Sequence, residues 1–332
     1  MGEAIGIAGV FIGCCLNAVF LELLVKGDPG CGNLVTFSQF FFIALEGFIF
    51  TRRFGTKRRY IPLRSYAVVV AMFFICNLCN NYAFDFNIAM PLHMIFRSGS
   101  LVANMVMGII ILKRTYPVSK FVSVAFITCG VIICTIMSGQ DIKKESIGIS
   151  LQSNEDSLFW WFLGISLLIF ALFVSARLGI YQEVLFTTYG KHPYEALYFT
   201  HLLPLPFFLL ISKNLLEHFY IILESPTFSI DLLGLQLSIP LMFIYLVGNV
   251  LTQYLCISSV YYLTTETSSF TVTLVLTLRK FASLLFSIFY FQNTFTLFHW
   301  IGTICVFVGT LTFTEIHLKL HKIYYDSKMK QS

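Results

Sequence analysis

The chain has 332 residues, of which 57% are hydrophobic and 12% charged, and its formal net charge is +5 at neutral pH. Charged residues are about half as frequent as in soluble globular domains, so this composition excludes an ordinary soluble protein. Long apolar runs recur from one end of the chain to the other, which is typical of a polytopic helical membrane protein.

Ten apolar segments approach the roughly 20 residues that a helix needs to cross a bilayer. In chain order they cover residues 4–25, 34–50, 66–84, 91–112, 119–137, 158–178, 194–211, 240–260, 268–291 and 297–317. Turn-forming and basic stretches such as KGDPGCGN and RRFGTKRRYIPLR separate them. We therefore expect an all-α membrane protein with ten transmembrane helices.

The lysines and arginines predict the orientation of these helices. Suppose that the N-terminus is cytosolic and that each span takes the chain to the other side of the membrane. Fifteen of the 22 basic residues then lie in cytosolic loops or the C-terminal tail. Four lie on the opposite side and three lie within spans. Because cytosolic loops of membrane proteins are enriched in Lys and Arg, both termini are expected in the cytosol.

The two halves of the chain resemble each other weakly. The segment that begins near Arg97 (FRSGSLVANM) aligns with the one that begins near Arg279 (LRKFASLLFS), and Gly130 then meets Gly309. Five spans in each half give the halves opposite orientations, the inverted repeat of many secondary transporters. We expect one transporter domain that consists of a first repeat at residues 1–145, a second repeat at 146–318, and a cytosolic tail at 319–332.

Three basic residues lie within spans, where charges are costly. Arg279 and Lys280 are about a dozen residues from either end of their span, and a cation at such a depth costs about 2.5–3.5 kcal/mol on insertion scales. Because this is too far for snorkelling, we expect a water-filled cavity or an anionic partner. For Arg97 an interhelical ion pair is the alternative, with Glu22 or Glu46 as partner.

Three cations among few deep acids predict a basic central cavity, which suits a multiply anionic solute such as a phosphate compound. Aromatic and amide side chains that could contact a base or a sugar there are Asn81, Tyr82, Tyr198, Phe199, His201, Asn249 and Gln253. Taken singly, each of them is also typical of the polar contacts that hold membrane helices together.

The sequence contains no HExxH motif, no Walker lysine loop and no GxSxG motif, so an enzyme is not expected. The nine cysteines do not resemble a disulfide framework, and those in apolar runs are expected to pack as small hydrophobic residues. The pair Cys76 and Cys79 is interpreted in the same way rather than as a metal or redox site. We expect no cofactor and no metal.

The chain ends with DSKMKQS, which places Lys330 third and Lys328 fifth from the C-terminus. This spacing resembles the dilysine signal that coat machinery reads on cytosolic tails of proteins retrieved to the endoplasmic reticulum. The predicted orientation supplies the cytosolic tail that such a signal requires.

Long strings of the sequence resemble one transporter family. They are CCLNAVFLELL, NNYAFDFNIAMPLHMIFRSGSLVANM, YQEVLFTTYGKHPYEALYFTHLLPLPFF and TLRKFASLLFSI, and the likeness covers essentially the whole chain. The chain resembles the nucleotide-sugar transporters of the drug/metabolite transporter superfamily. Within them, it is most similar to the animal carriers of UDP-xylose and UDP-N-acetylglucosamine in solute carrier family 35, subfamily B.

The resemblance implies ten helices in two inverted five-helix repeats, around a cavity that opens alternately to the cytosol and the lumen. It also implies an antiporter that brings UDP-N-acetylglucosamine or UDP-xylose into the Golgi or endoplasmic reticulum lumen in exchange for UMP. Where relatives have GALNK, this chain has TLRK, so Lys280 takes the place of their phosphate-binding lysine and Arg279 that of the asparagine. Arg97 matches a fourth-helix lysine, and YFTH (Tyr198 to His201) loosely matches the FYNN element that reads the nucleotide.

Two other functions are compatible with the residues alone. The chain could carry another phosphorylated metabolite, or it could be a membrane enzyme that uses nucleotide-sugar or lipid-phosphate substrates. The expected partners are a UDP-sugar, UMP, the lipid bilayer and the coat machinery, without nucleic acid. Small-residue faces such as GIAGVFIGCC allow a homodimer without demanding one.

Overall fold

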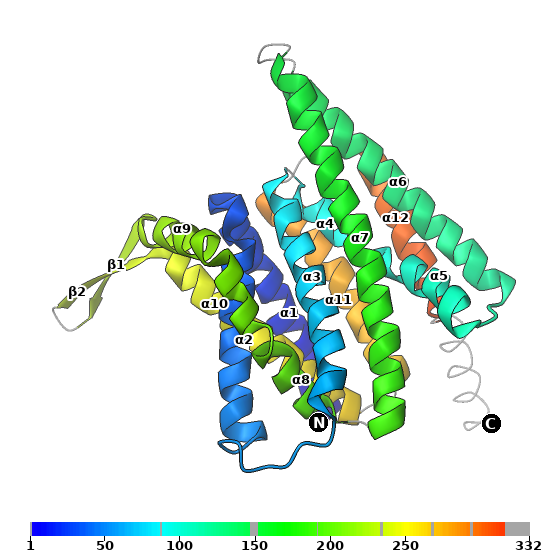
Figure 1. The fold of residues 1–332 in the computed structure, drawn as a ribbon. Coiled ribbons are helices and arrows are strands. Elements are labelled where there is room, and N and C mark those ends of the chain that lie inside the picture. The colour runs from blue at the N-terminus through cyan, green and yellow to red at the C-terminus, as the bar shows by residue number, and fades with distance from the viewer. Residues whose placement is uncertain are drawn as a thin grey trace, which may run out of the picture. The chain divides into compact units, whose positions relative to one another are not determined.

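The computed structural model describes residues 2–86, 88–146, 152–190, 192–232, 235–266, 269–292 and 295–315. Most of them are helical, as the apolar runs predict (Figure 1). The helices of the first half are α1 (Gly2–Gly27), α2 (Gly32–Glu46), α3 (Leu63–Asp85), α4 (Met90–Ser98), α5 (Ser100–Leu112) and α6 (Val118–Ser146). Those of the second half are α7 (Gln152–Tyr189), α8 (Pro193–Leu202), α9 (Ser212–Leu223), α10 (Leu241–Glu266), α11 (Ser269–Phe291) and α12 (Leu297–Phe313). Short helical turns are η1 (Pro29–Cys31), η2 (Gly47–Thr51) and η3 (Leu205–Ile211).

Eight helical stretches among the described residues are long and apolar enough to cross a membrane. They coincide with the first eight predicted spans, and α11 and the shorter apolar helix α12 coincide with the last two. The expected all-α membrane fold is therefore confirmed. Two stretches run further than predicted, because α7 continues to Tyr189 and the seventh stretch continues through η3 and α9 to Leu223.

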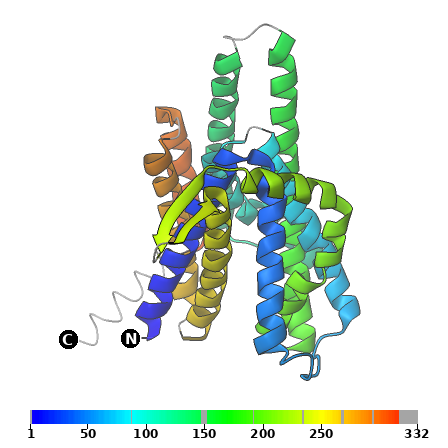
Figure 2. The same cartoon turned by 90° about the vertical axis from the view of Figure 1, so that its left-hand side faces the viewer.

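A small hairpin between α9 and α10 was not predicted (Figure 2). β1 (Thr227–Leu232) pairs antiparallel with β2 (Leu235–Pro240), from Thr227 opposite Pro240 to Leu232 opposite Leu235. Apolar and polar residues alternate in TFSIDL and LQLSIP, which is the period of a strand. This signal is readable in the sequence, although it is short.

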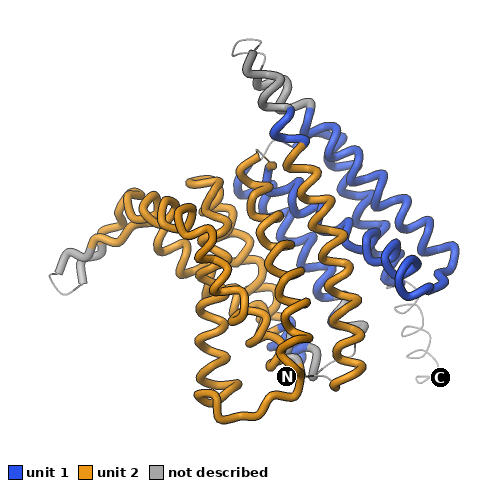
Figure 3. Tube along the Cα trace, viewed as in Figure 1, with its two compact units in different colours: residues 1–7, 89–162, 260–332 blue, residues 8–88, 163–259 orange. Residues whose placement is uncertain are grey.

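The chain divides into two compact units (Figure 3). Unit 1 comprises residues 1–7, 89–162 and 260–332, and unit 2 comprises residues 8–88 and 163–259. Each unit therefore combines helices from both halves of the sequence: unit 1 contains α4 to α6 together with α11 and α12. The predicted division at residue 145 concerns sequence repeats rather than compact units, and it stays a prediction.

In unit 1, α6 and α12 pack antiparallel through glycines (Figure 1). A Cβ atom on Gly130 would lie 2.9 Å from the backbone nitrogen of Val306, and one on Gly309 would lie 2.8 Å from the backbone oxygen of Ser123. Such distances leave no room for a side chain. Glycine at both positions therefore lets the two helix backbones touch.

The contacts between α6 and α12 are also reciprocal. Gly130 packs on Val306 as Gly309 packs on Ile127, and Gly309 and Val306 follow Gly130 and Ile127 by the same 179 residues. Two equivalent helices related by a twofold axis make isologous contacts of this kind. The sequence alignment pairs the same two glycines.

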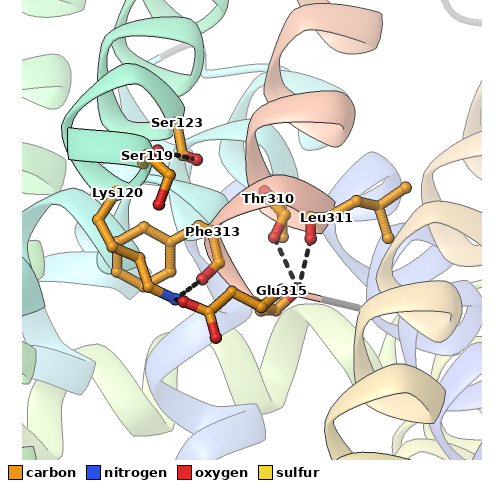
Figure 4. A network of polar contacts seen from close by, with 8 residues as sticks. Ser119, Lys120, Ser123, Thr310, Leu311, Phe313 and Glu315 are labelled. Carbon is orange, nitrogen blue, oxygen red and sulfur yellow. Dashed lines mark hydrogen bonds and ion pairs between the residues drawn. The ribbon is translucent and has the colours of Figure 1, made fainter. Parts of the chain in front are cut away.

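Lys120, near the start of α6, joins the end of α12 (Figure 4). Its ammonium lies 3.0 Å from a carboxylate oxygen of Glu315 and donates a hydrogen bond to the carbonyl oxygen of Phe313. It also lies 4.8 Å from the centre of the Phe313 ring. These contacts hold the two helix ends together in unit 1.

In unit 2, α1 and α10 lie side by side (Figures 1 and 2), and a disulfide joins Cys14 to Cys256. The Cα atoms of the two cysteines are 4.7 Å apart. This corrects the expectation that the cysteines within apolar runs act as small hydrophobic residues without disulfides. The remaining seven cysteines are free thiols. The sequence could not reveal the pair, because 242 residues separate its members.

The same packing covers the small-residue face GIAGVFIGCC. Gly9 lies against Ser259, and a Cβ atom on Gly13 would lie 2.7 Å from the backbone nitrogen of Cys256. This part of the α1 face is occupied within the chain. The predicted homodimer, which stays a prediction, would therefore require another surface.

Candidate functional site

The three membrane-embedded cations all belong to unit 1. Arg97 lies in the last turn of α4, Arg279 and Lys280 lie in the middle of α11, and these two helices pack against each other. The side chains of Arg97 and Lys280 are exposed, and that of Arg279 is half-buried. The charges of Arg97 and Arg279 act on Lys280, so the three form one basic cluster.

Lys280 differs from its two neighbours in its contacts. Among the described residues, no hydrogen bond and no ion pair involves Lys280, whereas Arg97 and Arg279 both have interaction partners. An exposed ammonium on an apolar helix, repelled by two further cations, is poorly compensated by the protein itself. The arrangement fits an anion that arrives from outside the protein.

The fourth predicted span has one irregular turn, beside Arg97. α4 ends at Ser98, α5 begins at Ser100, and the N–H of Gly99 between them bonds to the carbonyl of Phe96, three residues earlier, at 2.8 Å. Gly99 keeps helical backbone angles (φ −62°, ψ −11°), and Met90–Leu112 is one helical stretch long enough to cross a membrane. Arg97 therefore lies within a span whose helix tightens locally. The irregular turn was not predicted, although the sequence SGS marks it.

The two acids considered as partners lie in unit 2. A carboxylate oxygen of Glu46 accepts a hydrogen bond from the hydroxyl of Tyr254 at 2.8 Å. Glu22 is buried within α1, with 2% of its surface exposed. An ion pair between either acid and a cation of unit 1 stays a prediction.

The predicted amide ligands take part in networks between helices of unit 2. The Nδ2 of Asn81 donates to Thr36 at 2.8 Å and to Asn33 at 3.3 Å. The side chain of Asn249 is fully buried, accepts a hydrogen bond from Gln39 at 2.6 Å, and donates to the carbonyl of Asn17 at 3.0 Å. These contacts give both residues a role in packing, and contact with a substrate stays a prediction.

The aromatic element on α8 is buried in the core of unit 2. Tyr198 and Phe199 are each 6% exposed. His201 is equally buried, its Nδ1 lies 2.7 Å from the carbonyl oxygen of Leu197, and its ring meets the ring of Phe40 edge-on at 4.7 Å.

The geometry of this α8 element favours packing, and substrate contact stays a prediction for Tyr198, Phe199 and His201.

The remaining two candidates, Tyr82 on α3 and Gln253 on α10, have half-buried side chains. Lys328 and Lys330 lie outside the described residues.

Comparison with known proteins identifies the family. Residues 3–317 match the UAA transporter family. The chain is 56% identical to a protein of Drosophila melanogaster named endoplasmic reticulum GDP-fucose transporter, over 96% of this chain and 92% of the relative. It is 55% identical to the UDP-xylose and UDP-N-acetylglucosamine transporter of Danio rerio, over 95% of each protein. It is 52% identical to the nucleotide sugar transporter SLC35B4 of Homo sapiens, again over 95% of each.

These matches confirm the resemblance read from the sequence, and they exclude the membrane enzyme as an alternative. The family match spans the apolar helices and the basic cluster of α4 and α11 alike. The chain belongs to the UAA transporter family, and it is a multi-pass membrane transporter.

Proposed function

We propose that the protein is a nucleotide-sugar antiporter of the endoplasmic reticulum or Golgi membrane, which exchanges a luminal nucleoside monophosphate for a cytosolic nucleotide sugar. The observation that carries the proposal is the basic cluster on α4 and α11, with Lys280 exposed and uncompensated by the described residues. Lys280 neutralises the diphosphate of the substrate, Arg97 binds it from the neighbouring helix, and Arg279 assists or holds the bundle. A guanidinium such as that of Arg97 binds phosphate oxygens in a bidentate manner.

The relatives favour two substrate classes. The name of the Danio rerio protein supports UDP-xylose and UDP-N-acetylglucosamine, and that of the Homo sapiens protein supports a nucleotide sugar in general. For a UDP-sugar, UMP is the counter-substrate that we propose. The Drosophila melanogaster protein, which is equally similar, supports GDP-fucose as a second candidate. All three sugars share a nucleoside diphosphate, so the basic cluster serves each of them, and base and sugar contacts decide among them.

Exchange follows from electrostatics if the empty cavity carries several uncompensated cations. Such a cavity reorients slowly across the bilayer, whereas one filled by an anion reorients readily. We further propose that alternating access uses two inverted five-helix repeats. The reciprocal contacts of α6 and α12 support this proposal, because an inverted repeat predicts them.

The test is uptake of labelled nucleotide sugars into proteoliposomes preloaded with UMP, with GMP or with buffer. We expect uptake of UDP-N-acetylglucosamine or UDP-xylose that requires internal UMP. Uptake of GDP-fucose driven by internal GMP would instead identify the second candidate. Equal uptake with and without internal nucleotide would contradict antiport, and uptake of phosphorylated metabolites that UMP does not inhibit would contradict the substrate class.

The site assignment is tested in the same vesicles with Lys280→Ala and with Lys213→Ala as matched control. Lys213 is an exposed lysine on α9 of unit 2. We expect the first variant to lose uptake and the second to retain it. Normal uptake by Lys280→Ala would contradict the assignment while leaving the substrate class intact.

A further inference from the structure

The segment that joins the second and third spans is strongly basic. Between Thr51 and Ser65 it contains five exposed cations, namely Arg53, Lys57, Arg58, Arg59 and Arg64. Residues 47–84 contain no aspartate and no glutamate. Among the described residues, none of these five cations takes part in an ion pair. We call residues 52–64 the basic loop.

The first part of the basic loop is a hydrogen-bonded turn rather than an extended tether. The backbone N–H of Phe54 bonds to the carbonyl of Phe48 at 2.9 Å, and that of Lys57 bonds to the carbonyl of Arg52 at 3.3 Å. Arg53 and Phe54 have positive φ angles of 45° and 57°, which non-glycine residues adopt only when their surroundings hold them there. The cations on this turn therefore project from a folded backbone.

A buried carboxylate holds the second part of the loop. Glu195, near the start of α8, is 7% exposed and accepts hydrogen bonds from the backbone N–H of Tyr60 at 3.1 Å and of Ile61 at 3.0 Å. It also accepts one from the hydroxyl of Tyr66 at 3.3 Å. The ring of Tyr60 stacks on that of His192 at 4.1 Å. Glu195 thus binds backbone donors of the loop, and within the described part of the chain it forms no ion pair with the five exposed cations.

Aromatic side chains accompany the cations. Phe50 is 71% exposed and Phe54 is 69% exposed, directly beside Arg53. Exposed phenylalanine rings together with Lys and Arg are typical of segments that lie in the membrane interface. The basic loop joins two stretches that are long enough to span the bilayer, Pro29–Thr51 and Leu63–Asp85, and its last two residues form the start of the second. Its cations and rings therefore lie at the membrane surface.

We propose that the basic loop is a binding surface for anionic phospholipid headgroups such as that of phosphatidylserine. Several cations on one side of a membrane segment attract such lipids. The positive-inside rule, by which cations orient membrane helices, depends on the number of cations in a loop and not on their arrangement. It therefore requires neither the hydrogen-bonded turn nor the contacts of Glu195. The proposal is independent of the substrate that the protein carries.

The test uses the purified full-length protein in a neutral detergent, titrated with short-chain phosphatidylserine and, for comparison, with short-chain phosphatidylcholine. Bound lipid is counted by native mass spectrometry. Arg58→Gln/Arg59→Gln removes two cations of the loop, and Lys26→Gln/Lys213→Gln removes two exposed cations elsewhere in unit 2. We expect the first variant to weaken phosphatidylserine binding by about 30-fold and the second to leave it unchanged.

Glu195→Leu distinguishes an ordered binding surface from diffuse electrostatic attraction. This variant makes the protein more positive by one charge and removes both carboxylate oxygens, which accept the hydrogen bonds of Tyr60 and Ile61. Diffuse attraction predicts equal or tighter binding of phosphatidylserine, whereas an anchored surface predicts weaker binding, which we expect. Equal losses in both double variants, or no loss in Arg58→Gln/Arg59→Gln, would overturn the proposal. So would displacement of the bound lipid by free UDP-sugar, which would make the loop an entry for the nucleotide.

Discussion

The polar groups of the two units differ in how fully the protein satisfies them. In unit 1, Lys280 is exposed, repelled by two cations and without a hydrogen bond among the described residues. In unit 2, Asn249 is fully buried and bonded to two other helices. Both were predicted as substrate ligands from the sequence. A polar residue within a span is therefore a candidate for ligand binding when the protein leaves its hydrogen-bonding groups unsatisfied. It is a candidate for packing when other helices satisfy them.

The largest expected effect is on transport and comes from Lys280. Replacing it by alanine should lower uptake by about 10- to 150-fold, the equivalent of the 1.5–3 kcal/mol of a hydrogen bond to a charged group. The thermal unfolding temperature should stay the same or rise, because a repelled cation is removed. A clear loss of thermal stability, with uptake per folded molecule retained, would place Lys280 among the structural residues.

Asn249→Ala should show the opposite pattern to Lys280→Ala, with a loss of stability and no effect on substrate binding. It leaves the side-chain amide of Gln39 and the carbonyl of Asn17 without their partner, at a cost of about 1–3 kcal/mol of stability. We expect a lower unfolding temperature and an unchanged KM for the nucleotide sugar. Gln253→Ala, on the same helix at a half-buried position, is the control and should change stability little. A raised KM in Asn249→Ala would restore this residue as a ligand.

Substitutions at the glycine contacts of α6 and α12 test whether these two helices of unit 1 are related by a twofold axis. Gly130→Ala and Gly309→Ala each place a methyl group against the backbone of the other helix, which typically costs about 1–3 kcal/mol. If the two helices are equivalent, the two variants should lower the unfolding temperature by similar amounts. A large effect from one and none from the other would argue against equivalence.

The smallest effect on stability and transport is expected for Lys120, a cation of unit 1 that forms an ion pair with Glu315. Lys120 and Glu315 are 17% and 38% exposed, and ion pairs of this exposure contribute about 0–1 kcal/mol. Lys120→Met should therefore change the unfolding temperature by a degree or two at most and leave uptake as it is. The variant serves as the control for Lys280→Ala, since both remove one positive charge from unit 1. Loss of uptake in Lys120→Met would show that charge in unit 1 matters irrespective of position.

The helices could be predicted because hydrophobicity alone determines them. The predicted span 268–291 and the observed α11, Ser269–Phe291, differ by one residue. The irregular turn at Gly99 was not predicted, because hydropathy does not detect local helix geometry within an apolar run. The disulfide and the role of Asn249 depend on residues more than 200 positions away. Such contacts arise from tertiary packing, which a single sequence does not reveal.

The cations of the site were predictable for a different reason. A charge in the middle of an apolar run is costly wherever the helix packs, so Arg97, Arg279 and Lys280 stand out without any knowledge of their neighbours. Amides and aromatic residues carry no comparable penalty. His201 is equally plausible in a core and in a cavity, and its bond to Leu197 is what favours the core.

The bond between Cys14 and Cys256 links assembly to the timing of synthesis. α1 is synthesised before α10, and the partner of Cys14 follows 242 residues later. At the usual pace of translation Cys14 waits on the order of 10–50 seconds for Cys256 to be made. During that interval the glycine face of α1 has no α10 to cover it and must be shielded by lipid or a chaperone. A nascent chain arrested before Cys256 will therefore lack the disulfide partner of Cys14, however many helices have already been inserted.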